Sequence, residues 1–229
     1  MSFSTIGEGT FVWFVGEVVN NSDDPDKAGR VQIKVINEHF DKISDDKLPW
    51  AIIMMPPTSS SYRGKGWSPT GIEVGSHVVG FYMDGKEKNI PVVMGTFHIP
   101  KPNGNPANHD VNAAARGENG SASQYPFNKV YETVSGHTIE VDDTPGYERL
   151  NITHKSGSYI MMDENGDINI ISNVNNTEYT EKDKFMFVNS GDLQVQVING
   201  KVNIVSKDKV SITSSTAISI QAPIVGINP

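Results

Sequence analysis

The chain has 229 residues, a mass of 25.0 kDa, a formal net charge of −8 and no cysteine. This length fits one large domain or two modest ones. The absence of cysteine excludes a disulfide framework, a thiolate metal site and a cysteine nucleophile. An acidic chain without lysine and arginine clusters also argues against a nucleic-acid partner, because phosphate contacts need concentrated positive charge.

No run approaches 18 consecutive apolar residues, and residues 1–5 lack a basic region followed by an apolar run. We therefore expect neither a membrane span nor a secretory signal, and folding in the cytosol of the producing cell.

The balance of aliphatic residues predicts an all-β fold. The chain holds 45 valine and isoleucine residues but only three leucines, although leucine is normally among the commonest residues. β-branched side chains are stiff at χ1 and suit a pleated surface better than a helix. A helix bundle is excluded.

Residues 1–98 alternate short apolar runs with clusters of Gly, Pro, Asp and Asn. The runs cover residues 11–19, 30–36, 50–55, 77–83 and 90–97. Five short strands with this punctuation predict a small closed barrel. Residues 99–127 are poor in large apolar side chains and are predicted to be a linker.

Residues 128–229 carry apolar pairs at a spacing of eight, in three phased blocks. Within each pair, positions i and i+2 lie on one face of a short strand. The first block runs through Ile152/His154, Ile160/Met162 and Ile168/Ile170; the second through Thr177/Tyr179, Phe185/Phe187 and Leu193/Val195; the third through Val202/Ile204, Val210/Ile212 and Ile218/Ile220.

Eight residues are too few for one coil of a single-chain solenoid. Each octad strand is therefore expected to have one apolar face and two edges that its own chain does not cover. Three copies wound about one axis would pair the edges and bury the faces. We predict a homotrimeric, intertwined β-prism. The octad residues predicted to form its trimer core are Ile160, Met162, Ile168, Ile170, Phe185, Phe187, Leu193, Val195, Val202, Ile204, Val210, Ile212, Ile218 and Ile220.

Two groups of residue strings resemble a known family. Residues 29–35, 67–75 and 90–97 resemble the N-terminal OB-fold domain of the central spike of contractile-tailed bacteriophages. Residues 125–149, continuing to 154–157, resemble the start of that family's triple-stranded β-helix and the equivalent part of the VgrG spikes of type VI secretion. The resemblance implies an OB-fold barrel at residues 1–98 and a trimeric β-helix needle at residues 128–229.

The same resemblance implies a function and a location. It implies a needle in the virion tail baseplate, assembled in the bacterial host cytoplasm, whose OB domains are held by the baseplate hub. Contraction of the tail sheath would then drive the needle through the host outer envelope.

One departure from the family limits what is transferred. The best-known member carries a lysozyme domain between the OB domain and the β-helix, where this chain has only the linker. We therefore predict no muramidase activity, since the paired carboxylates would have to come from Asp110 and Glu118 in the linker. The alternatives are a spike with a peptidoglycan-degrading activity of its own or bound in trans, and a type VI secretion spike. VgrG spikes usually fuse a hub-like domain to the spike, which favours the phage role.

The sequence offers no catalytic, metal or cofactor site. Residues 80–87 resemble a phosphate-binding loop, but Glu87 stands where Ser or Thr would coordinate magnesium. Residues 163–167 resemble a calcium loop with a misplaced glycine. Both are better interpreted as β-hairpin turns, at Asp84–Gly85 and Asn165–Gly166. The six histidines are dispersed singly, and no Gly-x-Ser-x-Gly string occurs.

The C-terminal end carries no charge after Lys209. An uncharged tip would cross lipid at a smaller desolvation cost, and a buried trimer core would have the same composition. The end would leave strand edges open in all three chains, so we predict that a small PAAR-like protein caps it. The predicted cap-binding residues are Ile224, Val225, Gly226, Ile227, Asn228 and Pro229.

Overall fold

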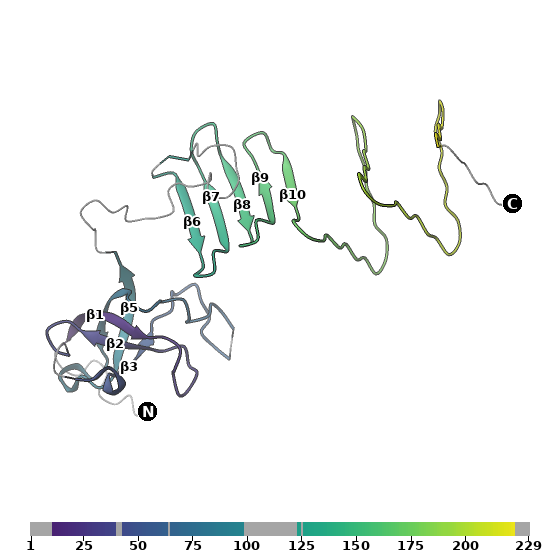
Figure 1. Ribbon diagram of the computed structural model, residues 1–229. Helices are drawn as coiled ribbons and strands as arrows, with labels where there is room; N and C mark the ends of the chain where they lie inside the picture. Colours follow the sequence, from purple (N-terminus) through teal and green to yellow (C-terminus); the bar gives the residue numbers. More distant parts are fainter. Residues whose placement is uncertain (1–10, 40–42, 64, 99–122, 125, 223–229) are drawn as a thin grey trace. The chain divides into compact units, whose positions relative to one another are not determined.

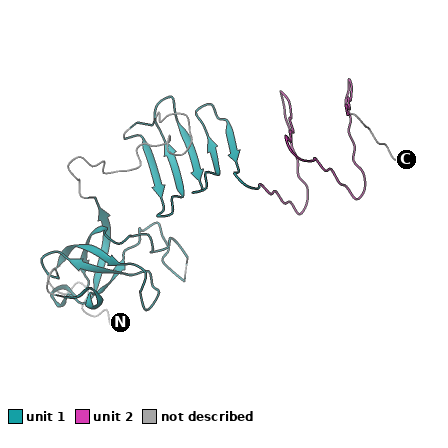
Figure 2. Ribbon diagram, viewed as in Figure 1, with its two compact units in different colours: residues 1–175 teal, residues 176–229 magenta. Residues whose placement is uncertain are grey.

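The computed structural model describes residues 11–39, 43–63, 65–98, 123–124 and 126–222 (Figure 1). The chain divides into two compact units, residues 1–175 and residues 176–229 (Figure 2). The described residues of the first unit form a barrel and a separate sheet. Their helical turns are the 3-10 helices η1 (Asp45–Lys47) and η2 (Gly85–Glu87). Within the described ranges, no helix has the length and apolar character needed to cross a membrane.

Five strands close the barrel, in the order β1-β2-β3-β5-β4. All neighbours are antiparallel except β3 and β5, which are parallel. This arrangement is consistent with an OB fold, and each strand falls within one of the five predicted apolar runs or overlaps it. The strands are β1 (Trp13–Asn20), β2 (Val31–Val35), β3 (Trp50–Ile53), β4 (His77–Tyr82) and β5 (Pro91–Phe97).

Inward-facing side chains of all five strands fill the barrel core. The alternation of buried and partly exposed positions along β1 and β4 is the period of two that a strand requires. The core residues are Phe14, Val18, Val31, Ile33, Val35, Ala51, Val78, Tyr82 and Val93.

Gly80 allows β4 and β5 to approach closely inside the barrel wall. A Cβ at this position would lie 2.0 Å from the Val92 carbonyl oxygen and 2.6 Å from the Phe14 ring. The β4–β5 register shifts beside it, between Val79 and Gly80. A glycine in a strand interior often marks such a close backbone approach.

The predicted hairpin at Asp84–Gly85 is confirmed. Strands β4 and β5 pair antiparallel across it, and the turn contains η2. The Asp84 carboxylate accepts hydrogen bonds from the backbone N–H groups of Asn89 (2.7 Å) and Ile90 (3.2 Å). The Asp84 carboxylate therefore satisfies two backbone donors at the end of the loop, as in a self-contained hairpin turn.

The second sheet is an antiparallel meander in the order β10-β9-β8-β7-β6 (Figure 1). Its strands are β6 (Asn128–Glu132), β7 (Thr138–Asp142), β8 (Arg149–Thr153), β9 (Tyr159–Met162) and β10 (Ile168–Ile171). The predicted Asn165–Gly166 hairpin is confirmed between β9 and β10. Gly166 has φ 83°, and Asp163 Oδ1 accepts the N–H groups of Asn165 and Asp167, each at 3.0 Å.

This sheet differs from the expectation that no octad strand has a partner in its own chain. The octads at residues 152–154, 160–162 and 168–170 fall on β8, β9 and β10 or directly after β8, and these strands pair with one another. Short turns let consecutive strands fold back, so an antiparallel meander covers their inner edges without a second chain. No strand occurs among the described residues 172–222, where the later octads lie.

Candidate functional site: an exposed apolar face

One face of the second sheet carries two rows of apolar side chains that run across the strands. The register places Tyr131 opposite Ile139, Ile139 opposite Ile152, and so on to β10. Because residues two apart on a strand share a face, a second row lies beside the first. The first row is Tyr131, Ile139, Ile152, Ile160 and Ile170; the second is Val141, Leu150, Met162 and Ile168.

These nine side chains, which we call the apolar face, are all exposed. Their exposed fractions lie between 38% for Val141 and 64% for Tyr131. Contiguous apolar surface of this kind on a protein marks an interaction site or an aggregation liability. The face is therefore a candidate interaction surface.

The structure brings the first predicted core residues together in this face. Ile160, Met162, Ile168 and Ile170 lie on β9 and β10, in the two rows. Four further members were not predicted: Tyr131, Ile139, Val141 and Leu150. The available signal was the alternation of apolar and polar residues along residues 138–142 and 149–153, which does not follow the spacing of eight.

The later octad residues lie outside this sheet, and the structure does not bring them into a common core. Their exposed fractions range from 51% to 88%, and Phe185 stacks on Phe187 with ring centroids 6.0 Å apart. The residues are Phe185, Phe187, Leu193, Val195, Val202, Ile204, Val210, Ile212, Ile218 and Ile220. The predicted cap-binding residues 224–229 lie outside the described residues.

On the opposite face of the same sheet, β7 and β8 bury polar side chains. Glu140 and Asp142 on β7 and Asn151 on β8 are at most 2% exposed, and Thr138 and Thr153 are buried beside them. Burying carboxylates costs free energy unless they are paired and hydrogen-bonded. Their partners therefore decide whether this face is stable.

Arg149 connects the two buried carboxylates. Its Nη2 lies 3.0 Å from Glu140 Oε1 and 3.9 Å from Asp142 Oδ2. Asn128 Nδ2 donates to Glu140 Oε1 at 2.8 Å, and the Thr144 N–H donates to Asp142 Oδ1 at 3.0 Å. The Ser123 hydroxyl donates to Asp142 Oδ2.

The environment of Asp142 favours its charged form. Burial opposes ionisation, but hydrogen bonds from Ser123 and Thr144, together with the charge of Arg149, outweigh it and lower the pKa of the carboxyl below its usual range. This cluster was not predicted from the sequence, because strand alternation does not say which of two faces becomes buried.

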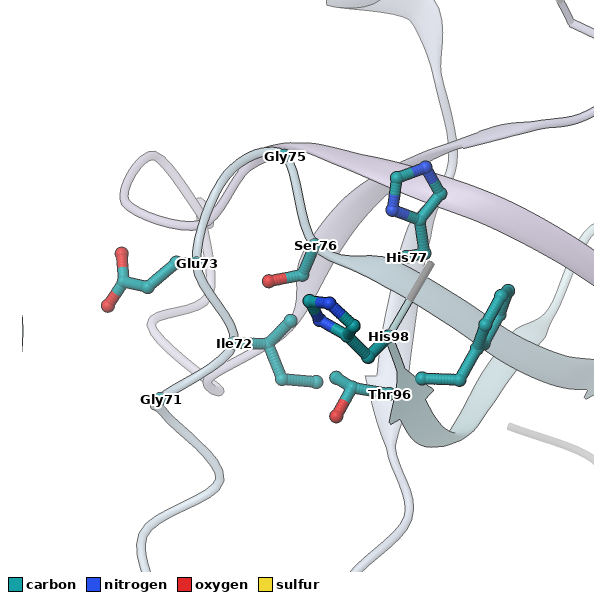
Figure 3. A pocket seen from close by; sticks show the side chains of 9 residues that line it. Gly71, Ile72, Glu73, Gly75, Ser76, His77, Thr96 and His98 are labelled. Carbon is teal, nitrogen blue, oxygen red and sulfur yellow. The ribbon is translucent and has the colours of Figure 1, made fainter. Parts of the chain in front are cut away.

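An open pocket of about 740 Å³ lies on the barrel, where β4 begins and β5 ends (Figure 3). The loop before β4 supplies Ile72, Glu73 and Ser76, and His77 and His98 come from the strand ends. The His77 and Phe97 rings are 6.0 Å apart, and Glu73 Oε2 accepts a hydrogen bond from Asn21 Nδ2 at 3.1 Å.

The contacts at this pocket, the His77–Phe97 ring pair and the Asn21–Glu73 hydrogen bond, do not form a nucleophile–base pair. Across the described residues, no three His, Asp or Glu side chains are grouped so that they could hold a metal ion. The apolar face is thus the feature of the structure that most requires a functional explanation.

Comparison with known proteins gives a family match that covers most of the barrel and the whole second sheet. The model of the Gp5 N-terminal OB domain matches residues 32–185, which is more than half of the chain. The match runs from β2 in the barrel through all five strands of the second sheet.

Two curated relatives are similar to parts of this chain. Protein Gp5 of Vibrio phage KVP40 is 27% identical over 230 residues, covering 65% of this chain and 54% of the relative. The pre-baseplate central spike protein Gp5 of Enterobacteria phage T4 is 39% identical over 93 residues, covering 37% of this chain and 16% of the relative. The chain thus spans about half of one relative and a smaller part of the other. With its family match over barrel and sheet, the chain belongs to the Gp5 OB-domain family of phage central spike proteins.

Proposed function

We propose that this chain is a structural spike component of a contractile phage tail baseplate, and that it works as a homotrimer. The observation that carries the proposal is the apolar face, found in a chain whose relative is named a pre-baseplate central spike protein. The role places the protein in the virion tail, after assembly in the host cytoplasm.

The apolar face and the later octads supply the surface for trimer formation. Each buried apolar Å² contributes about 25 cal/mol, so covering nine large side chains is a substantial driving force. An isologous dimer would cover the sheet face but would not provide strand neighbours around a common axis for residues 176–222. Three chains intertwined in a β-helix needle would cover the apolar face and would also give residues 176–222 strand neighbours around a common axis.

The two parts of the chain have separate tasks in this proposal. The barrel attaches the needle to the baseplate hub, and the needle pierces the host outer envelope mechanically when the sheath contracts. A small PAAR-like protein covers the strand edges at residues 224–229. The chain itself has no enzymatic task, and the work comes from the sheath.

The mass of the full chain in solution tests the trimer. Light scattering on the purified protein is expected to give about three times the 25.0 kDa chain mass. A mass of one chain at micromolar concentration would contradict the proposal, because the apolar face would then remain uncovered in the working protein.

Activity and partner binding need separate measurements. The purified chain is expected to leave peptidoglycan intact in a clearing assay, with hen-type lysozyme as the positive control. Clearing by the chain alone would overturn the non-enzymatic role. Clearing only after co-purification with a second phage protein would show that the spike carries an enzyme in trans.

A further inference from the structure

Strand β6 is both the first strand of the second sheet and one of its two edges. Among the strands that the structure describes, it pairs with β7, and the pair at its N-terminal end joins Asn128 to Asp142. An edge strand that is free at its outer end opens one residue pair at a time, because each step breaks few contacts. The chain that leads into β6 therefore controls how easily the sheet begins to open.

The residues before β6 are attached to other parts of the sheet. The Ser123 hydroxyl donates to Asp142 Oδ2 and accepts a hydrogen bond from Arg149 Nη2 at 3.2 Å. The Gln124 N–H donates to Thr144 Oγ1 at 2.9 Å. A backbone bond from the Phe127 N–H to the Gln124 carbonyl, at 2.8 Å, then turns the chain toward β6.

These contacts attach Ser123 and Gln124 to three parts of the sheet. Asp142 ends β7, Thr144 lies in the turn that follows, and Arg149 begins β8. Ser123 is 8% exposed, Asp142 2% and Thr144 0%, so water does not compete well for these hydrogen bonds. Arg149 also pairs with Glu140 in the middle of β7.

We propose that Ser123 and Gln124 form an anchor that fastens the incoming chain to β7 and β8 and so prevents β6 from opening at its N-terminal end. Tension applied to the preceding residues therefore acts on the hydrogen bonds of the anchor before it reaches the Asn128–Asp142 strand pair. The anchor's hydrogen bonds do not depend on the proposed spike function. Its mechanical role rests on that function, because a barrel and a needle joined by one linker need a junction that resists tension.

Hydrogen exchange on the full-length protein, followed by mass spectrometry, tests the anchor. Ser123→Ala removes the donor to Asp142 and the acceptor for Arg149, and Thr144→Val removes the acceptor for Gln124 with little change of shape. Each variant is expected to speed exchange of peptides covering residues 124–132 by about tenfold or more, the factor that one buried hydrogen bond supports. Exchange in β9 and β10 stays unchanged.

Ser135→Ala is the matched control. Ser135 lies in the turn at the other end of β6, is exposed, and its hydroxyl oxygen lies 3.3 Å from Thr133 Oγ1. It is expected to leave exchange at residues 124–132 unaltered.

Two results would overturn the anchor: unchanged exchange in both Ser123→Ala and Thr144→Val, or equally faster exchange over all five strands. Circular dichroism identifies a variant that fails to fold, and Ser123→Thr, which keeps a hydroxyl, then tests whether protection returns. Light scattering on the same samples reports the trimer separately. A monomeric protein with a protected β6 would leave the anchor intact and contradict only the proposed function.

Discussion

Asp24 organises the loop between β1 and β2 through a single buried carboxylate. It accepts hydrogen bonds from Arg30 Nη2 (2.6 Å) and Nε (3.1 Å) and from the backbone N–H groups of Asp26, Ala28 and Arg30. The side-chain bond from Arg30 outweighs burial and, with the backbone bonds, holds the pKa of Asp24 well below its usual range.

Asp24→Asn should therefore destabilise the barrel by about 2 kcal/mol at pH 7, because it removes the charge that Arg30 and three N–H groups face. The folded pKa is lowered, so this contribution is complete above the ordinary aspartate pKa. It declines as the pH falls below about 4, where the unfolded chain takes up a proton first. Urea unfolding between pH 3 and pH 7 should show the two proteins converging at acid pH.

The neighbouring Asp23→Asn is the control for this loop. Asp23 is exposed and its side chain accepts a hydrogen bond from Asn20 Nδ2 at 3.0 Å. The free energy of unfolding of Asp23→Asn should match that of the parent protein across the pH series. An equal loss of stability in both variants would mean that net charge, and not the Arg30 contact, sets the effect.

Gly80 and Gly95 give a second comparison at single positions, since both lie on the β4–β5 pair. Gly80→Ala should cost about 3 kcal/mol or more, because the added methyl group meets backbone at Val92 and the ring of Phe14. Gly95→Ala meets no atom within 4 Å and should be close to neutral. Thermal unfolding measures both, and a neutral Gly80→Ala would contradict the packing of this barrel wall.

At the scale of elements, the second sheet has an exposed apolar face and, on the other side of β7 and β8, buried polar side chains. Ordinary globular sheets have the reverse relation. The polar face is stable because Arg149 and hydrogen-bonding neighbours compensate Glu140 and Asp142. The apolar face has no such compensation in one chain, so the element points to association.

Ile160→Lys tests this association at the centre of the apolar face. In the proposed trimer, a lysine there would have to bury its charge between three chains, which costs several kcal/mol for each lysine. Because Ile160 is 47% exposed within one chain, the strand pairs of the sheet should survive. The expected result is a mass near 25.0 kDa by light scattering with the β-type circular dichroism retained.

Asn165→Lys adds the same charge to the exposed β9–β10 turn and should leave the assembled mass unchanged. If Ile160→Lys assembles as the parent does, the apolar face does not form the interface between chains.

At the scale of the whole molecule, the proposed trimer couples assembly to folding for residues 128–222. Octad side chains that are at least half exposed in one chain would gain their burial from the other two chains of that trimer. Unfolding of this part then includes dissociation, so its melting temperature should rise with chain concentration. A tenfold dilution should lower the midpoint by a few degrees, measured by calorimetry.

The barrel supplies an internal reference for this measurement. Its core lies within residues 14–93 of one chain, so its transition should not depend on concentration. A single transition without concentration dependence would contradict assembly through residues 128–222.

Much of the fold follows from local patterns that the sequence displays directly. Short apolar runs separated by clusters of turn residues predicted all five barrel strands, and the turn residues Asp84–Gly85 and Asn165–Gly166 predicted both hairpins. The spacing of eight also predicted that Ile160, Met162, Ile168 and Ile170 share one face. Period-two alternation is a property of the strand itself, so it needs no knowledge of neighbours.

Only the tertiary structure decided which strands pair and which face is buried. Pairing of β8, β9 and β10 within one chain depends on turn geometry, and the spacing of eight is equally compatible with pairing between chains. Burial of Glu140 and Asp142 depends on Ser123 and Arg149, which lie 26 positions apart in the sequence and meet only after folding. The sequence therefore determined the barrel strands and the apolar sides of β8, β9 and β10, because both follow from local patterns, and long-range contacts determined which strands pair and what covers each side.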